Sequence, residues 1–249
     1  MATAISARYV LSMKSVKLHP KPAVGFSSTC SIPGSPRNVG HVAISSYPHR
    51  RSAGIHISGA YDSTGVESLD LLDTVKIFGL DGKPLLISEL WTDRKAVVAF
   101  ARHFGCLLCR KRADYLAAKK GIMDSQGVAL VLIGPGSVDQ ACAFYEQTKF
   151  EGEVYADPTY ASYEALNFVS GIATTFTLSG GLKVIQSYME GYRQDWKLSF
   201  EKETLARGGM QQGGIIVAGP GKTNISYIHR DKEAGDDPDI QEVLRACCS

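Results

Sequence analysis

The first 60 residues contain no aspartate and no glutamate, although they carry seven lysines or arginines and eleven serines. This composition is typical of an organelle transit peptide, and the serine content with the Met-Ala start favours a chloroplast over a mitochondrion. The segment also lacks the continuous apolar stretch of a secretory signal, and its scattered prolines and glycines argue against a stable domain. We therefore expect residues 1–60 to be a disordered plastid transit peptide, cleaved between about Arg51 and Ala60; the alternative is a disordered tail without a targeting role.

The rest of the chain lacks any run approaching the roughly 20 apolar residues that a membrane-spanning helix requires. It also lacks a basic surplus, because all 25 acidic residues but only 20 of the 27 basic ones lie after residue 60. A net acidic body gives no reason to expect nucleic acid as a partner. Repeats, heptad runs and low-complexity blocks are absent as well, so we expect one soluble domain over residues 67–249.

Strand and helix patterns alternate along this domain. Two short apolar runs on either side of Asp81-Gly82 predict a hairpin with a tight turn. KAVVAFAR (95–102) and VALVLIG (128–134) are continuous apolar runs of strand length, as in strands that are buried on both faces. EVYAD (153–157) predicts a third strand, whose last residue suits the cap of a helix that begins at Pro158.

Helices are expected after the first two of these strands. One begins at Cys106 and ends near Gly121, since cations and glycine are favoured at a helix C-terminus. The other follows Ser137 as its N-cap. Residues 171–207 give mixed signals, strand-like over 172–178 and helix-like over 195–206, and an insertion is one interpretation.

The chain ends with an antiparallel pair of strands joined by PGKT (220–223) and a closing helix over residues 237–247. Parallel strands, then an antiparallel pair, then a final helix are the order of a thioredoxin-like α/β fold. Such a fold has a central mixed sheet flanked by helices.

Cys106 and Cys109 lie where the first buried strand gives way to a helix. A thiol there is close to free backbone N–H groups and to the positive end of the helix dipole, which favour thiolate over thiol. Such positions lower a cysteine pKa from near 8.5 to roughly 3.5–7.5. Arg102, His103 and the three cations at 110–112 add positive potential. Because the second thiol lies at i+3 on the same helical face, attack by one sulfur can be followed by disulfide closure.

Three runs, VVAFARHFGCLLCRKRADYLAAKK (97–120), VALVLIGPG (128–136) and residues 213–244, resemble the AhpC/TSA antioxidant-domain proteins of the peroxiredoxin-like group. The resemblance covers most of residues 70–246. It implies thiol-dependent reduction of peroxides, in which a thiolate attacks a peroxide or a disulfide and a Cys106–Cys109 disulfide follows. A thioredoxin or glutathione system would then reduce that disulfide. The cycle requires no metal, haem or nucleotide cofactor.

Two departures from the family patterns leave the attacking sulfur open. The peroxiredoxin pattern P-x-x-x-T-x-x-C places Cys109 at the peroxide-attacking position, with Arg102 at the proline and Cys106 at the threonine. The C-x-x-C pattern of thioredoxins nominates Cys106 instead, and we favour it for mixed-disulfide attack because it lies nearer the helix N-terminus. The cis-proline that faces the thiols in thioredoxins is also missing, since QQGG (211–214) occupies its position.

Two other classes of function remain. A zinc or iron–sulfur site would need both thiols to converge with Cys247 and Cys248, but adjacent residues of one helix project about 100° apart, which makes joint ligation awkward. A redox sensor or thiol-protein binding module without turnover is favoured by the missing threonine and proline, whereas the intact thiol pair argues against it.

The remaining candidate residues have structural interpretations. Cys142 has apolar neighbours at helical spacing, so we expect it in the core. Cys247 and Cys248 are expected on a frayed C-terminus, with a resolving role as the alternative. His229 is expected on the surface of a strand, and His103 is expected to support the thiols.

Overall fold

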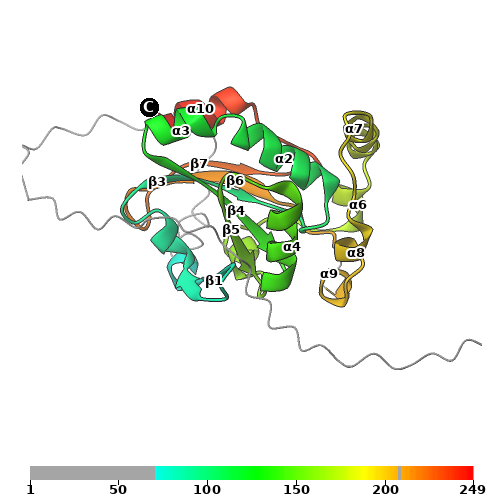
Figure 1. Ribbon diagram of the computed structural model, residues 1–249, viewed down its shortest axis with the longest axis horizontal. Coiled ribbons are helices and arrows are strands. Elements are labelled where there is room, and N and C mark those ends of the chain that lie inside the picture. The colour runs from blue at the N-terminus through cyan, green and yellow to red at the C-terminus, as the bar shows by residue number, and fades with distance from the viewer. Residues whose placement is uncertain (1–70, 207–208, 249) are drawn as a thin grey trace, which may run out of the picture.

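The structure is a computed structural model that describes residues 71–206 and 209–248. The expected transit peptide and the expected start of the domain at residue 67 lie outside this range. The described residues form one sheet of seven strands in the order β2-β1-β5-β4-β3-β6-β7 (Figure 1). The strands are β1 (Lys76–Gly79), β2 (Pro84–Leu86), β3 (Lys95–Phe100), β4 (Val128–Pro135), β5 (Glu153–Asp157), β6 (Gly214–Ala218) and β7 (Ile225–Arg230).

The sheet is mixed, as the sequence predicts. β3, β4 and β5 run parallel, and the antiparallel pair β6 and β7 extends the sheet beyond β3. The predicted hairpin of β1 and β2 lies beyond β5, with Gly82 in the left-handed region of its turn at φ 75°. This order confirms the predicted thioredoxin-like fold.

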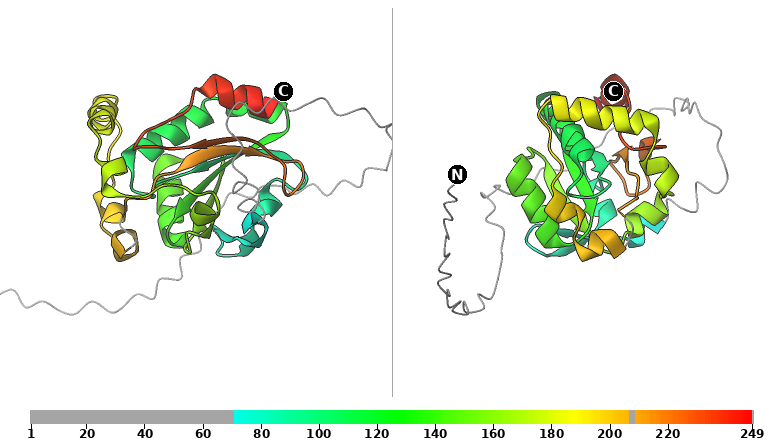
Figure 2. Two further views of the ribbon diagram at one scale, coloured as in Figure 1. Left: turned by 180° about the vertical axis from the view of Figure 1, so that it is seen from behind. Right: turned by 90° about the vertical axis from the view of Figure 1, so that its right-hand side faces the viewer.

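Helices cover both faces of the sheet. α2 (Leu107–Ala117), α3 (Lys120–Ser125), α4 (Val138–Thr148) and α10 (Ile240–Cys248) pack on one face. α5 (Ala161–Ala165) packs on the other, with the 3₁₀ helices η1 (Leu71–Thr74) and η2 (Ile87–Leu90). A further group, α6 (Ile172–Thr175), α7 (Leu178–Met189), α8 (Trp196–Ser199) and α9 (Lys202–Ala206), stands beside the sheet at the end where β4 and β5 finish (Figures 1 and 2).

β3 explains why the thiols have a rigid support. Val97 and Ala99 point into one core and Val98 and Phe100 into the other, all fully buried. A strand that is buried on both faces has no polar side to expose, which accounts for its continuous apolar sequence. Its carboxyl end delivers the chain to Cys106 at a fixed position.

The structure corrects three local predictions. The strand-like residues 172–178 form α6 and the start of α7, because the Thr177 hydroxyl accepts the Gly180 N–H at 2.9 Å and caps α7. The helix expected at Pro158 begins only at Ala161, after Tyr160 adopts φ 63°.

The third correction concerns the helix that carries the thiols. It ends at Ala117, and Gly121, expected at its C-terminus, lies inside the separate helix α3.

None of the helices in residues 71–206 and 209–248 combines the length and apolar character that a membrane crossing needs.

Candidate functional site

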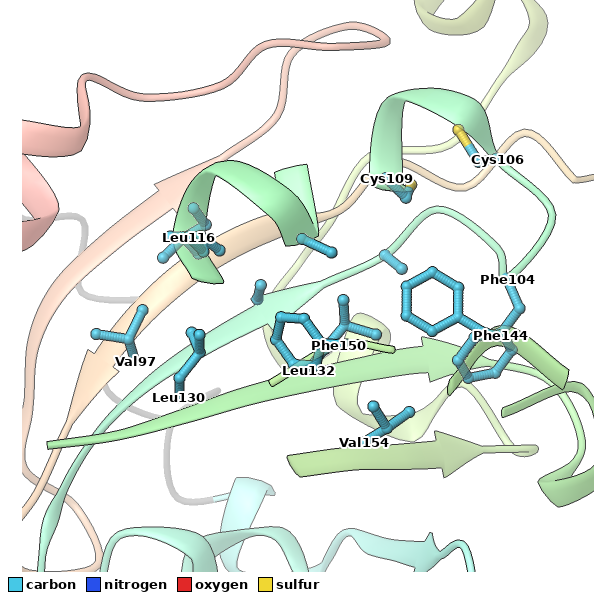
Figure 3. Close-up of a cluster of buried hydrophobic side chains, with 14 of the residues drawn as sticks. Val97, Phe104, Cys106, Cys109, Leu116, Leu130, Leu132, Phe144, Phe150 and Val154 are labelled. Atoms are coloured by element: carbon cyan, nitrogen blue, oxygen red, sulfur yellow. The ribbon is translucent and has the colours of Figure 1, made fainter. Parts of the chain in front are cut away.

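The two thiols lie in the first turn of α2 (Figure 3). Cys106 is the N-cap, with extended φ and ψ of −71° and 125°, and its N–H donates to the His103 carbonyl at 3.1 Å. Cys109 follows as the third residue of the helix. Both are free cysteines, and they are only 2% and 4% exposed. The predicted pair is therefore assembled, but beneath the molecular surface.

Arg102 contacts both sulfurs. Its backbone N–H donates to Cys109 Sγ at 3.1 Å, and its guanidinium Nη1 lies 3.8 Å from Cys106 Sγ. The guanidinium is held from the other side by the Gln211 carbonyl at 3.2 Å and the Thr175 hydroxyl at 3.3 Å. The residue that stands at the proline of the peroxiredoxin pattern thus places a fixed cation against the pair.

The surroundings separate the pKa values of the two cysteines. The hydrogen bond from the Cys109 thiol, together with the charges of Arg102 and His103, holds the pKa of Cys106 well below its usual value, although burial opposes this. The same hydrogen bond, burial and the neighbouring Cys106 charge raise the pKa of Cys109 well above its usual value. These directions favour a thiolate at Cys106 and a thiol at Cys109.

Replacing Arg102 by methionine is expected to raise the pKa of Cys106, because the nearest cation is lost while the volume is nearly kept. The midpoint of the ultraviolet thiolate absorbance should move to higher pH, and alkylation of Cys106 at neutral pH should slow. Lys111→Met is the control, since the Lys111 ammonium pairs with Glu190 at 2.6 Å instead. An equal shift in both variants would contradict the assignment.

His103 also lies beside the pair, as expected. Its ring is buried, and within the described residues its Nδ1 has no hydrogen-bond partner. Burial lowers the pKa of His103, while the Cys106 charge opposes that effect. The two groups are linked, because a charged imidazole favours the Cys106 thiolate and the thiolate favours a charged imidazole.

Residues 194–199 pack against Gly105 and Leu107, on either side of Cys106, which the sequence did not predict. The Gln194 Oε1 accepts the Leu107 N–H at 3.0 Å, and the Asp195 N–H donates to the Gly105 carbonyl at 3.0 Å. A Cβ at Gly105 would lie 2.5 Å from the Ser199 hydroxyl, so this close approach requires glycine. One of the helix N–H groups that the sequence left free is therefore occupied, and the segment holds the turn around Cys106 in place.

Asp195 fastens this segment. Its carboxylate caps α8 through the Leu198 N–H at 3.0 Å, accepts the Gln147 amide N–H at 2.9 Å and lies 3.7 Å from the Arg110 guanidinium. Asp195→Ala removes all three contacts and should cost the closed state about 1 kcal/mol, which is about fivefold in an opening equilibrium. Alkylation of Cys106, followed by peptide mass spectrometry, should accelerate by that factor. Asp124→Ala, on α3, should leave the rate unchanged; an unchanged rate in Asp195→Ala would mean that this segment is not the barrier.

Below Cys109 lies a buried ion cluster. Arg112 contacts Asp231 through two nitrogens, at 2.9 and 3.0 Å, and Asp237 at 2.5 Å. A cavity of about 10 Å³ between Cys109, Arg112 and Asp231 is about the size that one water needs. The cluster joins α2 to the segment after β7 and so fixes the helix that carries the thiols.

A cavity of about 410 Å³, larger than the one beside Cys109, lies elsewhere. It is lined by Phe78 of β1, Pro158 and Tyr160 after β5, the start of α4 and residues of α9. Neither sulfur contributes to it. This cavity is therefore separate from the thiol pair.

The other predicted residues have different surroundings. Cys247 is 1% exposed and packs into the core from α10, so the expectation of a frayed end is wrong for it. Cys247 lies near Lys95, whose charge acts on its thiol. Lys95 is the first residue of β3, whereas Cys106 and Cys109 follow the last residue of that strand, five residues and roughly 17 Å further on. Within the described residues no three His, Cys, Asp or Glu side chains gather as metal ligands. The structure does not bring Cys247 to Cys106 and Cys109.

Two further expectations have mixed outcomes. Cys142 is half-buried rather than fully in the core, and its thiol donates to the Leu80 carbonyl at 3.6 Å. His229 is not a surface group, because its Nε2 lies 2.6 Å from the Asp236 carbonyl and the side chain is 22% exposed. No cis-proline stands before β6 in the described chain; the cis bond there, Gly219–Pro220, follows that strand.

Comparisons with known proteins place the chain. The family described as AhpC/TSA antioxidant enzyme matches residues 115–233. "Thioredoxin-like protein AAED1, chloroplastic" of Arabidopsis thaliana is 67% identical over 204 residues, 80% of this chain and 82% of that protein. "Peroxiredoxin-like 2C" of Homo sapiens is 30% identical over 199 residues, 76% and 81% of the two chains. A solved structure of Xanthomonas campestris peroxiredoxin Q is 12% identical and covers 72% of this chain and 92% of its own, with a TM-score of 0.49.

The chain belongs to the AhpC/TSA family of thioredoxin-like, peroxiredoxin-like proteins. This confirms the resemblance drawn from the sequence. The matched family segment begins at residue 115, after both cysteines, so it does not include the candidate pair.

Proposed function

We propose that the protein is a thiol-dependent oxidoreductase that reduces peroxides, or protein disulfides, with Cys106 and Cys109. The observation that carries the proposal is the position of Arg102, which contacts both sulfurs at the start of α2. The opposite directions of the two pKa shifts support a nucleophile at Cys106 and a protonated partner at Cys109. Membership of a family of antioxidant enzymes supports the same class of reaction.

In the proposed cycle the Cys106 thiolate attacks one oxygen of a peroxide, and the O–O bond breaks. The departing oxygen leaves as alkoxide and takes a proton, giving an alcohol or water, while Cys106 becomes a sulfenic acid. Cys109 then attacks the Cys106 sulfur, water leaves, and a disulfide forms. A dithiol of the thioredoxin type or two molecules of glutathione return the two electrons.

The charge on Cys106 sets the order of these steps. It is one of the causes that raise the pKa of Cys109, so Cys109 keeps its proton while Cys106 is a thiolate. Oxidation of Cys106 to sulfenic acid removes that charge. The pKa of Cys109 then falls, and the second thiol becomes available only when there is a sulfenic acid to attack.

A plastid location completes the proposal. The Arabidopsis relative is named chloroplastic, and residues 1–60 have the composition of a transit peptide. On this basis the working domain is residues 67–249, and the thioredoxin or glutathione system of the plastid is the electron donor.

A redox sensor without turnover is the second candidate, and the burial of both sulfurs favours it. Peroxide consumption by the full chain, supplied with thioredoxin and its reductase or with glutathione and its reductase, separates the two. An enzyme consumes many equivalents of peroxide per chain and a sensor consumes one. Mass spectrometry of the oxidised protein should find the 106–109 disulfide, and a different linkage would refute the proposed pair.

A further inference from the structure

Large apolar side chains are exposed on one part of the surface. Within the described residues, the large apolar side chains that are at least 60% exposed all lie between residues 172 and 200. They are Ile172, Phe176, Leu178, Leu182, Ile185, Met189, Trp196 and Phe200. Exposed apolar patches of this density mark interaction sites in soluble proteins.

Four of these side chains form a stripe along α7. Leu178, Leu182, Ile185 and Met189 follow one another at spacings of 4, 3 and 4 residues, which is the heptad spacing of a helix-to-helix seam. Their exposures are 86%, 62%, 60% and 84%. We call these four residues the α7 stripe. Its spacing suits another helix, laid alongside over the roughly 18 Å that 12 residues span.

The opposite side of α7 is already in use. Ser187 is fully buried, Val184 and Tyr188 pack on the core cluster, and Glu190 after the helix pairs with Lys111 of α2 at 2.6 Å. In Figure 2 the helix lies across the outside of the molecule, with α8 and α9 on the same side. The stripe therefore faces outward from a helix that its own body holds in place.

Charge identifies the partner. Lys183 is the one charged residue of α7, and it pairs with Glu233 of the same chain at 3.3 Å. The heptad positions beside the seam are Ser179, Gly181, Gln186 and Tyr188, all uncharged, and the last of them is turned towards the core. An identical helix therefore meets no like-charge repulsion, whereas an anionic membrane or a charged protein would find nothing to pair with.

The exposed area is also sufficient. Fully buried aromatic side chains cover about 150–250 Å² each and aliphatic ones somewhat less, so the eight side chains at these exposures offer on the order of 800 Å², about half of it from the α7 stripe and the rest from residues 172–176 and 196–200 beside it. That is about what one partner contributes to a standard interface. We infer that the α7 stripe packs against the same stripe of a second copy, making a twofold homodimer. This inference does not depend on the thiol chemistry.

Sedimentation velocity of the full chain under reducing conditions tests the dimer. We expect a dimer for the natural sequence and a monomer for Leu182→Glu/Ile185→Glu, with the dissociation constant raised at least about a hundredfold because carboxylates would be buried without partners. The matched control is Leu71→Glu/Ile122→Glu, which places the same charges on apolar residues of η1 and α3 that are 56% and 49% exposed. The control should remain dimeric.

A charge swap locates the contact. An equimolar mixture of Leu182→Glu/Ile185→Glu with Leu182→Lys/Ile185→Lys should dimerise again, because the stripes would then carry opposite charges. Hydrogen exchange of the natural protein, which needs no variant, should show α7 amides gaining protection as concentration rises.

Four results would overturn the inference. They are a natural chain that sediments as a monomer at all concentrations, a glutamate variant that folds and stays dimeric, a control that dissociates equally, and concentration-dependent protection elsewhere than α7. A monomer whose stripe instead binds uncharged phosphatidylcholine vesicles would assign the surface to a lipid.

Discussion

Cys106→Ser should abolish peroxide turnover, with a loss of about a thousandfold or more, because serine at this position has no stabilised anion with which to attack. We propose Cys106 as the attacking thiolate, because the Cys109 thiol and Arg102 lower its pKa. The measurement is peroxide consumption with the reductase-coupled donor. Cys142→Ser, which changes a cysteine on α4, is the control and should retain activity.

Cys109→Ser should behave differently. Cys106 keeps its cation in this variant but has lost its resolving thiol, so it should consume one equivalent of peroxide and accumulate sulfenic acid, detected by a sulfenic-acid-specific label. The reverse result, with oxidation persisting in Cys106→Ser and absent from Cys109→Ser, would make Cys109 the attacking sulfur, as the peroxiredoxin pattern suggests.

Arg112→Ala should lower the free energy of unfolding by about 3–5 kcal/mol, because it leaves a buried carboxylate without its partner. Asp231 has only 1% of its side chain exposed and meets Arg112 through both oxygens. Urea unfolding at neutral pH measures the loss. Lys111→Ala, which removes a more exposed neighbouring cation, should change the free energy of unfolding by less than about 1 kcal/mol.

The loss in Arg112→Ala should also depend on pH. Burial raises the pKa of Asp231 even with Arg112 present, and removing the guanidinium raises it further. A carboxyl with a folded pKa above its unfolded value stabilises the fold while protonated, and that contribution disappears as pH rises through the folded pKa. The deficit should therefore be small near pH 4 and largest at alkaline pH, and a deficit independent of pH would exclude Asp231 as its cause.

The sequence predicted most elements because their signals are local. Residues 96–101 are apolar at every position, and Ser137 forms the predicted N-cap, its hydroxyl accepting the Gln140 N–H at 3.3 Å. The predictions that failed also rested on local signals, but tertiary contacts outweighed those signals. The β-branched residues over 172–178 suggested a strand, but the chain there has only the isolated bridge from Ser170 to Gln211 as sheet pairing and turns into helices.

The residues of the candidate site likewise fall into those with a local sequence signal and those without one. Cys106 and Cys109 were found by their spacing and by their position after a buried strand. Gln194 and Asp195 carried no signal, because they act across nearly 90 residues of sequence. Cys247, expected to be frayed, is buried because α10 packs against β3 and β6.

The sequence by itself determined the alternation of strands and helices, the junction that holds the thiols and the acid-free leader, since periodicity, caps and composition act over a few residues. Only the tertiary structure decided which groups surround the sulfurs. Arg102 reaches Gln211, and Arg112 reaches Asp231, because the sheet order sets β6 beside β3 and the ion cluster joins α2 to the segment after β7. Burial and the exposed α7 stripe follow from how these elements pack, which no local pattern encodes.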